Sequence, residues 1–310
     1  MKLWIKYLIA SLLGVACAFI LPTNNEAISS ALEYLTELVI RFGRYMTIPV
    51  MFFTVIVAVN KLRETNQIAK TALWTGGTIV VSSLLLSLVG LLSILVVRLP
   101  RFPITVEKVS ETATLNTANL IRTLFPYSPI ESLLNGSFLL ASFLFAGLIG
   151  GASASDNVLY RPIVQLADSL SKLMYNIAVF FTEFLSYGMA IILCYWTTKF
   201  RAIITSGVFS PMILLLLVDF LIVVGLIYPL IIRYICHDPH PYRILYASIC
   251  SAIAAFFSAD SNLILLINMR HGKESIGIRR RINGITFPLF NIFARGGSAL
   301  VTVVGFIMIW

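Results

Sequence analysis

The strongest constraint on this chain is a pair of apolar runs near its C-terminal end, each interrupted by polar residues. The first run begins at about Ala247 and is broken near its middle by residues 258–262, whose sequence is SADSN. A carboxylate and small polar side chains are costly in hydrocarbon. Broken backbone persists at membrane depth only where protein or a water-filled cavity satisfies it. Because this run is too short to cross a membrane twice as helix, it predicts a re-entrant helical hairpin with residues 258–262 at its tip.

The second run extends to Trp310 and is long enough to span a bilayer. Residues 294–298, with the sequence ARGGS, interrupt it with one charge and two glycines. Two interrupted helices that meet near the membrane midplane are a recurrent feature of transporter binding sites. We therefore expect a binding site where the hairpin tip and the broken helix approach each other.

The composition agrees with a membrane protein. Of the 310 residues, 58% are hydrophobic and only 12% are charged, which excludes an ordinary soluble domain. A net charge of +9 would suggest nucleic-acid binding in a soluble protein. Here most of the basic residues lie between apolar segments, where they orient the helices instead. We therefore predict no nucleic-acid partner.

The cysteines and histidines do not indicate a redox or metal site. The four cysteines have no paired spacing, and we interpret them as small buried hydrophobes rather than a disulfide framework. Residues 236–240 read CHDPH and so carry metal-binding residue types. A solvated turn opened by Asp-Pro is favoured there over a metal site. No metal and no organic cofactor is expected.

Apolar segments recur along the chain and predict an all-α integral membrane protein. We expect one membrane domain over residues 1–310, with about seven transmembrane helices and the hairpin. The first six helices are expected at about residues 3–21, 35–60, 73–97, 129–151, 161–196 and 208–235. Within the second of these, Arg41 and Arg44 are expected to snorkel to the surface or to pair with Glu37.

Basic residues set the expected orientation. Lys2 and Lys6 lie at the start of the first helix, and seven basic residues bracket the hairpin: Arg233, Arg243, Arg270, Lys273, Arg279, Arg280 and Arg281. Such clusters resist translocation across the membrane. We therefore predict a multi-pass protein of the cell (inner) membrane whose N-terminus and hairpin entry are cytoplasmic.

Several short motifs occur in the same order as in a known family. They are residues 44–53 (RYMTIPVMFF), Ser82-Ser83 with Gly90, residues 128–136 (SPIESLLNG), residues 268–270 (NMR) and residues 286–289 (TFPL). Together with the hairpin and the broken helix, this collinear order resembles the dicarboxylate/amino acid:cation symporter family. That family includes the prokaryotic glutamate/aspartate transporters and the excitatory amino acid transporters.

The resemblance implies two structural units. A scaffold-like part, about residues 1–60 and 129–196, would form a homotrimer in membrane lipid. A transport-like part, about residues 73–97 and 207–310, would move and would hold the solute. The implied solute-binding residues come from the hairpin tip and the broken helix: Ser258, Asp260, Ser261, Asn262, Arg295, Gly297 and Ser298.

The resemblance also implies a degenerate cation site at Ser82, Ser83, Ala294 and Gly296. Ser82 also shares a helical face with Thr75 and Thr78, and small hydroxylated faces commonly serve close helix packing. That packing interpretation is the alternative to cation coordination for the third helix.

The chain departs from the family pattern in three places. Family members continue beyond the seventh helix with a second hairpin and an eighth helix, so we expect either a truncated product or a shortened homologue that needs a partner. Their hairpin tip is serine-rich, whereas residues 260–262 here read DSN. Their Asn-Met-Asp-Gly-Thr motif reads ARGGS here, without the carboxamide and carboxylate that bind sodium. Hard cations prefer an anionic oxygen ligand, so we expect altered or absent sodium coupling, with Na+ or H+ as the coupling ion.

These observations favour a secondary active transporter, a symporter of a small anionic organic solute such as a dicarboxylate, glutamate or aspartate. Arg295 lies at the helix break, and a guanidinium matches a carboxylate with two parallel hydrogen bonds. The alternative is a truncated or degenerate membrane scaffold that does not transport. An intramembrane enzyme using Asp260 or Asp219 is disfavoured because no nucleophile–base pair is visible.

The charge changes also predict an ion pair. The hairpin tip gains a carboxylate at Asp260, and the seventh helix gains the guanidinium of Arg295. Removing one partner of a buried ion pair typically costs about 3–5 kcal/mol, so we expect these two charges to pair in the empty protein. The alternative is that Arg295 snorkels to water or pairs with Asp219.

Overall fold

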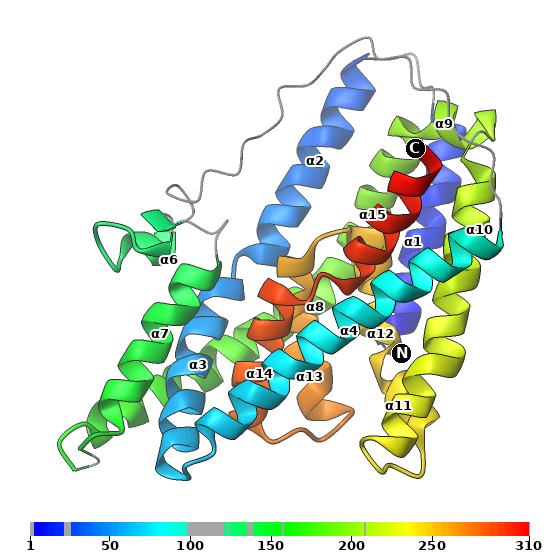
Figure 1. Ribbon diagram of the computed structural model, residues 1–310. Helices are drawn as coiled ribbons and strands as arrows, with labels where there is room; N and C mark the ends of the chain where they lie inside the picture. The colour runs from blue at the N-terminus through cyan, green and yellow to red at the C-terminus, as the bar shows by residue number, and fades with distance from the viewer. Residues whose placement is uncertain are drawn as a thin grey trace.

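A computed structural model describes residues 3–21, 26–97, 121–122, 124–134, 139–156, 158–207 and 209–309, and over these residues the chain is helical, with no strand (Figure 1). Six of the described helices or helix pairs are long and apolar enough to cross a membrane. The predicted all-α, multi-pass membrane bundle is therefore confirmed. Residues 22–25 and 98–120, which lie between expected helices, are outside the described residues.

The elements follow the predicted order. They are α1 (Leu3–Ile20), α2 (Glu26–Arg44), α3 (Thr47–Glu64), α4 (Ile68–Val96), α6 (Glu131–Leu134), α7 (Leu139–Ser153), α8 (Arg161–Lys199), α9 (Arg201–Ser206), α10 (Ser210–Ile222), the π-helical turn η1 (Val223–Ile227), α11 (Tyr228–Tyr234), α12 (Pro241–Ser258), α13 (Ser261–Glu274), α14 (Arg280–Phe293) and α15 (Gly296–Ile309). Of the helix expected at 129–151, residues 135–138 lie outside the described residues, and the described parts are α6 and the 15 residues of α7.

The helix expected at residues 35–60 is in fact two helices. α2 ends at Arg44 and α3 begins at Thr47, with a turn at Tyr45 and Met46 between them. Pro49 explains the break, because in a continuous helix its ring would clash with the carbonyl of Tyr45 and its missing N–H would leave that carbonyl unbonded. Restarting the helix at Thr47 places Pro49 in the first turn, where no N–H is needed.

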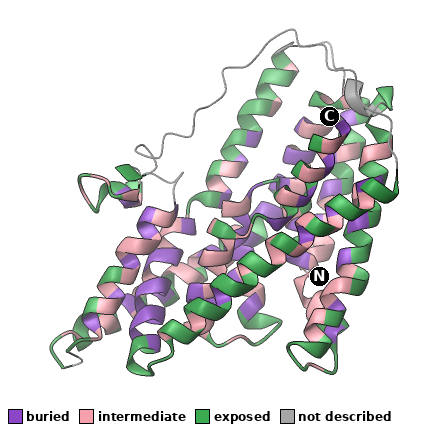
Figure 2. Cartoon of the chain, viewed as in Figure 1, coloured by how far each residue is buried: buried purple, intermediate pink, exposed green. Residues whose placement is uncertain are grey.

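The interior is centred on α3 and α8. α8 packs against α1, α2 and α3, and α3 also packs against α7 and α14. Buried residues therefore occur on nearly every face of α3, whereas α4 and α10 carry broad exposed apolar faces (Figure 2). Exposed apolar surface of this extent on membrane-length helices is the surface expected to face lipid.

Two glycines allow α4 and α15 to lie in close contact. A Cβ atom added at Gly90 would lie 2.9 Å from the carbonyl oxygen of Leu300. A Cβ atom added at Gly296 would lie 2.6 Å from Leu86 Cδ1. Small residues at such positions let helix backbones approach closely within a membrane. This contact fixes the start of α15 beside the middle of α4.

We predict that Gly90→Ala lowers the free energy of unfolding by about 1–3 kcal/mol, because the added methyl group forces α15 away from α4. Gly77→Ala is the matched control on the same helix, since nothing lies within 4 Å of its added Cβ. The control should be neutral or stabilising by about 0.5–1 kcal/mol. Thermal unfolding of both purified variants in detergent measures the difference, and equal stability would contradict the packing described here.

Candidate functional site

The predicted hairpin is formed by α12 and α13, which pack against each other and are joined at Ala259 and Asp260. Ala259 turns the chain in the left-handed region, with φ of 52°. The Ser258 hydroxyl donates to the carbonyl of Ala254 at 2.7 Å and accepts from the N–H of Asp260 at 3.4 Å. The polar residues of the tip therefore satisfy the backbone groups that the turn leaves free.

Asp260 is the centre of the tip. Its Oδ1 accepts from the N–H of Asn262 at 2.9 Å and from that of Leu263 at 3.4 Å, so it caps α13. Its Oδ2 accepts from Arg44 Nε at 2.5 Å. The Asp260 side chain is 6% exposed, whereas that of Arg44 is 45% exposed. The carboxylate is thus held both by a helix N-terminus and by a cation.

The expected pair between Asp260 and Arg295 is therefore wrong. Arg295 is exposed, and none of the ion pairs of the described residues involves it. The physical reason is the break after α2, which places Arg44 beside the tip. Arg41 pairs with Glu37 at 2.6 Å, as expected for that residue, and Arg44 is left to bind the tip carboxylate instead.

Asn262 joins the tip to two other elements. Thr47, at the start of α3, donates its hydroxyl to the Asn262 carbonyl at 3.2 Å. The side-chain amide of Asn291, on α14, donates to Asn262 Oδ1 at 3.2 Å. Asn291 lies three residues before the break in the seventh helix, so the hairpin tip and the broken helix do meet. Sequence reasoning missed Thr47 and Asn291, although an asparagine within the apolar run FPLFNIF was a signal for the second.

The seventh helix is broken where predicted. α14 ends at Phe293, Ala294 is extended, and α15 begins at Gly296. Arg295, Gly297 and Ser298 are exposed at the start of α15, and Ser261 is half-buried at the start of α13. Arg295 thus directly precedes the first turn of α15, in which Gly297 and Ser298 are exposed.

The structure also brings together three of the four residues of the expected cation site. A Cβ atom added at Gly296 would lie 3.5 Å from both the Ser82 carbonyl oxygen and the Ser83 Cα. The Ser82 hydroxyl donates to the carbonyl of Ile79 in its own helix at 3.0 Å. Ala294 lies at the adjacent break but offers only backbone atoms. The oxygens gathered here are neutral, and among the described residues no group of three or more His, Cys, Asp or Glu side chains is placed to hold a metal ion.

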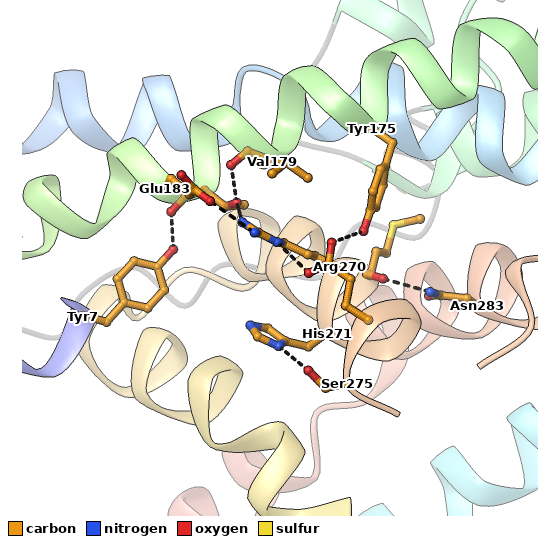
Figure 3. A network of polar contacts seen from close by, with 11 residues as sticks. Tyr7, Tyr175, Val179, Glu183, Arg270, His271, Ser275 and Asn283 are labelled. Carbon is orange, nitrogen blue, oxygen red and sulfur yellow. Dashed lines mark hydrogen bonds and ion pairs between the residues drawn. The ribbon is translucent and has the colours of Figure 1, made fainter. Parts of the chain in front are cut away.

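A second polar network anchors α13 to α8 (Figure 3). Arg270 donates to Thr182 Oγ1 at 2.9 Å, to Glu183 Oε1 at 3.3 Å and to Glu274 Oε2 at 3.1 Å. Tyr175 donates to the same Glu274 at 3.1 Å. On the other side of α13, Asn283 donates to the Met269 carbonyl at 2.9 Å, which ties α14 to the same helix. The sequence placed Arg270 in a family motif and in an orienting basic cluster, whereas the structure shows it binding α8.

A family model described as the sodium:dicarboxylate symporter family matches residues 3–310. The chain belongs to this family. The chain is also similar to the serine/threonine transporter SstT of Lacticaseibacillus casei and of Lacticaseibacillus paracasei, with 24% identity over 200 residues in each case. The match covers 62% of this chain and 44% of each relative, so the chain spans less than half the length of the curated relatives it matches.

Family membership confirms the resemblance drawn from the motifs. It identifies a multi-pass membrane protein and points to a transporter rather than to an enzyme. The individual site residues are interpreted from the geometry above.

We predict that the Arg44–Asp260 pair is energetically coupled. Asp260→Asn and Arg44→Gln should each lower the free energy of unfolding by about 1–3 kcal/mol, since each leaves a charged partner without its hydrogen bond. The double variant should lose less than the sum of the single losses. Chemical denaturation in detergent measures the three values.

The matched control is the exposed pair Glu37–Arg41. Its coupling energy should be about 0.3–0.5 kcal/mol, the value typical of ion pairs four residues apart on a helix. Strictly additive losses for Asp260→Asn with Arg44→Gln would show that the contact contributes nothing to stability.

Proposed function

We propose that this chain is the solute-binding part of a cation-coupled secondary transporter, and that its solute is a small organic anion such as a dicarboxylate, glutamate or aspartate. The observation that carries the proposal is the contact between the hairpin tip and the broken helix through Asn262 and Asn291, at 3.2 Å. Two interrupted helices that meet in this way supply polar groups inside a membrane without a continuous polar surface. Membership in a symporter family supports the same function.

The charge at the start of α15 favours an anion. The N-terminus of a helix carries a partial positive charge, and Arg295 is the residue immediately before α15. Two positive groups at one helix end are mutually unfavourable, and Arg295 has no ion pair within the described residues to offset them. A carboxylate bound there would accept hydrogen bonds from the guanidinium and from the exposed first turn of α15. Ser258, Ser261, Gly297 and Ser298 complete the proposed solute site, with Asp260 and Asn262 shaping its hairpin side.

A second candidate solute follows from the named relatives. Their printed name gives serine and threonine as the solutes. Asp260 offers a carboxylate at the hairpin tip for the amino group of a neutral amino acid. The Arg44 contact occupies one oxygen of that carboxylate, which weakens this candidate relative to an organic anion.

We further propose that sodium coupling is altered. Ser82, Ser83, Ala294 and Gly296 supply neutral oxygens only, whereas a hard cation favours at least one anionic ligand. The same proposal includes the division into a scaffold-like and a transport-like part and the homotrimer, which rest on the family resemblance. It also includes the cytoplasmic N-terminus, which rests on the basic cluster around the hairpin.

Binding and uptake experiments with Arg295→Gln test the proposed solute. We predict that this variant binds an organic dianion such as aspartate or succinate at least about 10-fold more weakly, because a charge-assisted hydrogen bond contributes about 1.5–3 kcal/mol. Arg279→Gln, in the turn after α13, is the matched control and should bind as the native chain does. Titration calorimetry in detergent and uptake into proteoliposomes provide the measurements.

Serine binding that is unaffected by Arg295→Gln, with no binding of either dianion, would favour the neutral amino acid instead. A chain that binds none of these solutes would be the non-transporting scaffold.

A further inference from the structure

Asp219 is a carboxylate buried in an apolar interface, away from the site described above. It lies on α10, and its residue is 1% exposed. Leu215 and Val223, four residues before and after it, are buried on the same face. The surrounding cluster is apolar and comes from α4, α10, η1 and α15: Leu86, Ile94, Leu215, Val223, Leu300, Val304 and Met308. The opposite face of α10 exposes Leu217, Val218 and Leu221, as a lipid-facing helix does.

The described hydrogen bond to the Asp219 side chain comes from a hydroxyl on a neighbouring helix. Ser93 Oγ, on α4, lies 2.8 Å from Asp219 Oδ2 and 3.1 Å from the carbonyl oxygen of Gly90. Asp219 Oδ1 is buried and has no hydrogen-bond partner among the described residues. The Ser93 hydroxyl has one proton, so it cannot donate fully to both acceptors.

Two arrangements are possible, and they differ greatly in cost. If Asp219 is ionised, Ser93 must turn its proton to Oδ2, and an anionic Oδ1 remains in an apolar cluster with no donor, which is strongly unfavourable. If Asp219 is protonated, it donates to Ser93, and Ser93 donates to Gly90. Each proton then serves one acceptor, and Oδ1 is only a neutral carbonyl oxygen.

Among the described residues, the helices that form this cluster place no cation beside Asp219. α4 carries Lys70 as its one charged residue, and α15 and the rest of α10 carry none. Arg295 precedes α15 at the level of Ser82 and Ser83, about 15 Å along α4 from Ser93. The phenol of Tyr228 also packs against the cluster.

We propose that Asp219 is a proton-binding site within the membrane, in which the protonated carboxyl group donates to Ser93. Given the proposed transport function, on which this step rests, that proton is the coupling ion, released to water as the interface between α10 and α4 opens. The π-helical turn η1 begins four residues after Asp219, and such turns occur frequently at functional sites.

A sodium ion fits this place less well than a proton. Asp219, Ser93 and Gly90 present few oxygens, whereas a hard cation needs several ligands. The direct hydrogen bond of 2.8 Å also leaves no space for an ion between the carboxylate and the hydroxyl.

Infrared spectroscopy of the full chain in lipid vesicles at neutral pH tests the proposal. The native chain should show the C=O stretching band of a protonated carboxyl group, which shifts in D2O and is lost in Asp219→Asn. Asp156→Asn is the matched control, because Asp156 is exposed in a turn and should not contribute. Absence of the band in the native chain, or its persistence in Asp219→Asn, would overturn the proposal.

If Asp219→Asn does not fold, Ser93→Ala provides a second variant for the same infrared measurement. Removing the acceptor should shift the wavenumber of the band, whereas Ser87→Ala, whose hydroxyl donates to Ser83 within α4, should leave it unchanged. An unchanged band in Ser93→Ala would contradict the hydrogen bond on which the proposal rests.

Transport measurements separate this inference from the proposed function. In Asp219→Asn vesicles, uptake driven by a proton gradient should be lost while exchange of solute for solute is retained. If the native chain shows the infrared band but no solute uptake, the transport function is refuted and the proton site is retained. Proton-driven uptake that survives in Asp219→Asn would refute the coupling role.

Discussion

The candidate site depends on the carboxylate of Asp260. It caps the N-terminus of α13 with one oxygen and accepts from Arg44 with the other. Both contacts are charge-assisted, and both are made by a side chain that is almost fully buried. Without them the tip would present an uncapped helix end and an unpaired charge inside the bundle. The site therefore needs the end of α2 as much as it needs the hairpin itself.

The break between α2 and α3 is what brings the end of α2 to the hairpin tip. Pro49 ends the continuous helix, and Gly43 leaves room for the hairpin, since a Cβ atom there would lie 2.6 Å from Leu263 Cδ1. The restart at Thr47 adds a third contact, through the Asn262 carbonyl. A short irregular junction thus positions a cation, a small residue and a hydroxyl around one tip.

The sequence was sufficient to predict the elements of the site, because polar residues within an apolar run leave few structures that satisfy the backbone. The hairpin at residues 258–262 and the break at Ala294 follow from that rule. The proximity of Ser82 to Gly296 followed from the family resemblance. The partner of Asp260 was not predictable in this way, since it depends on how α2 ends. Asn291 and Ser93 are recognisable as polar residues in the sequence, but their partners are set by helix packing between distant segments.

The two buried carboxylates show how differently one chain can neutralise a charge within a membrane. Asp260 is matched by a guanidinium and by a helix N-terminus, and it stays tied to the site. Among the described residues Asp219 contacts a hydroxyl and apolar side chains, which is why we propose that it binds a proton. Arg295 is the complementary case, a cation beside a positive helix end that has no ion pair within the described residues, which is where an anionic solute would be favoured.

Cross-linking in native membranes tests most directly whether the hairpin tip lies at the junction of α2 and α3. Thr47→Cys with Asn262→Cys, in a chain whose four native cysteines are replaced by serine, should be joined readily by a short thiol-specific cross-linker, because Thr47 Oγ1 lies 3.2 Å from the Asn262 carbonyl oxygen. Thr47→Cys with Ser275→Cys is the control, since Ser275 lies at the far end of α13, about 20 Å along the helix. Efficient cross-linking of the first pair alone is the result expected here. Equal cross-linking of both pairs, or none of the first, would contradict the account.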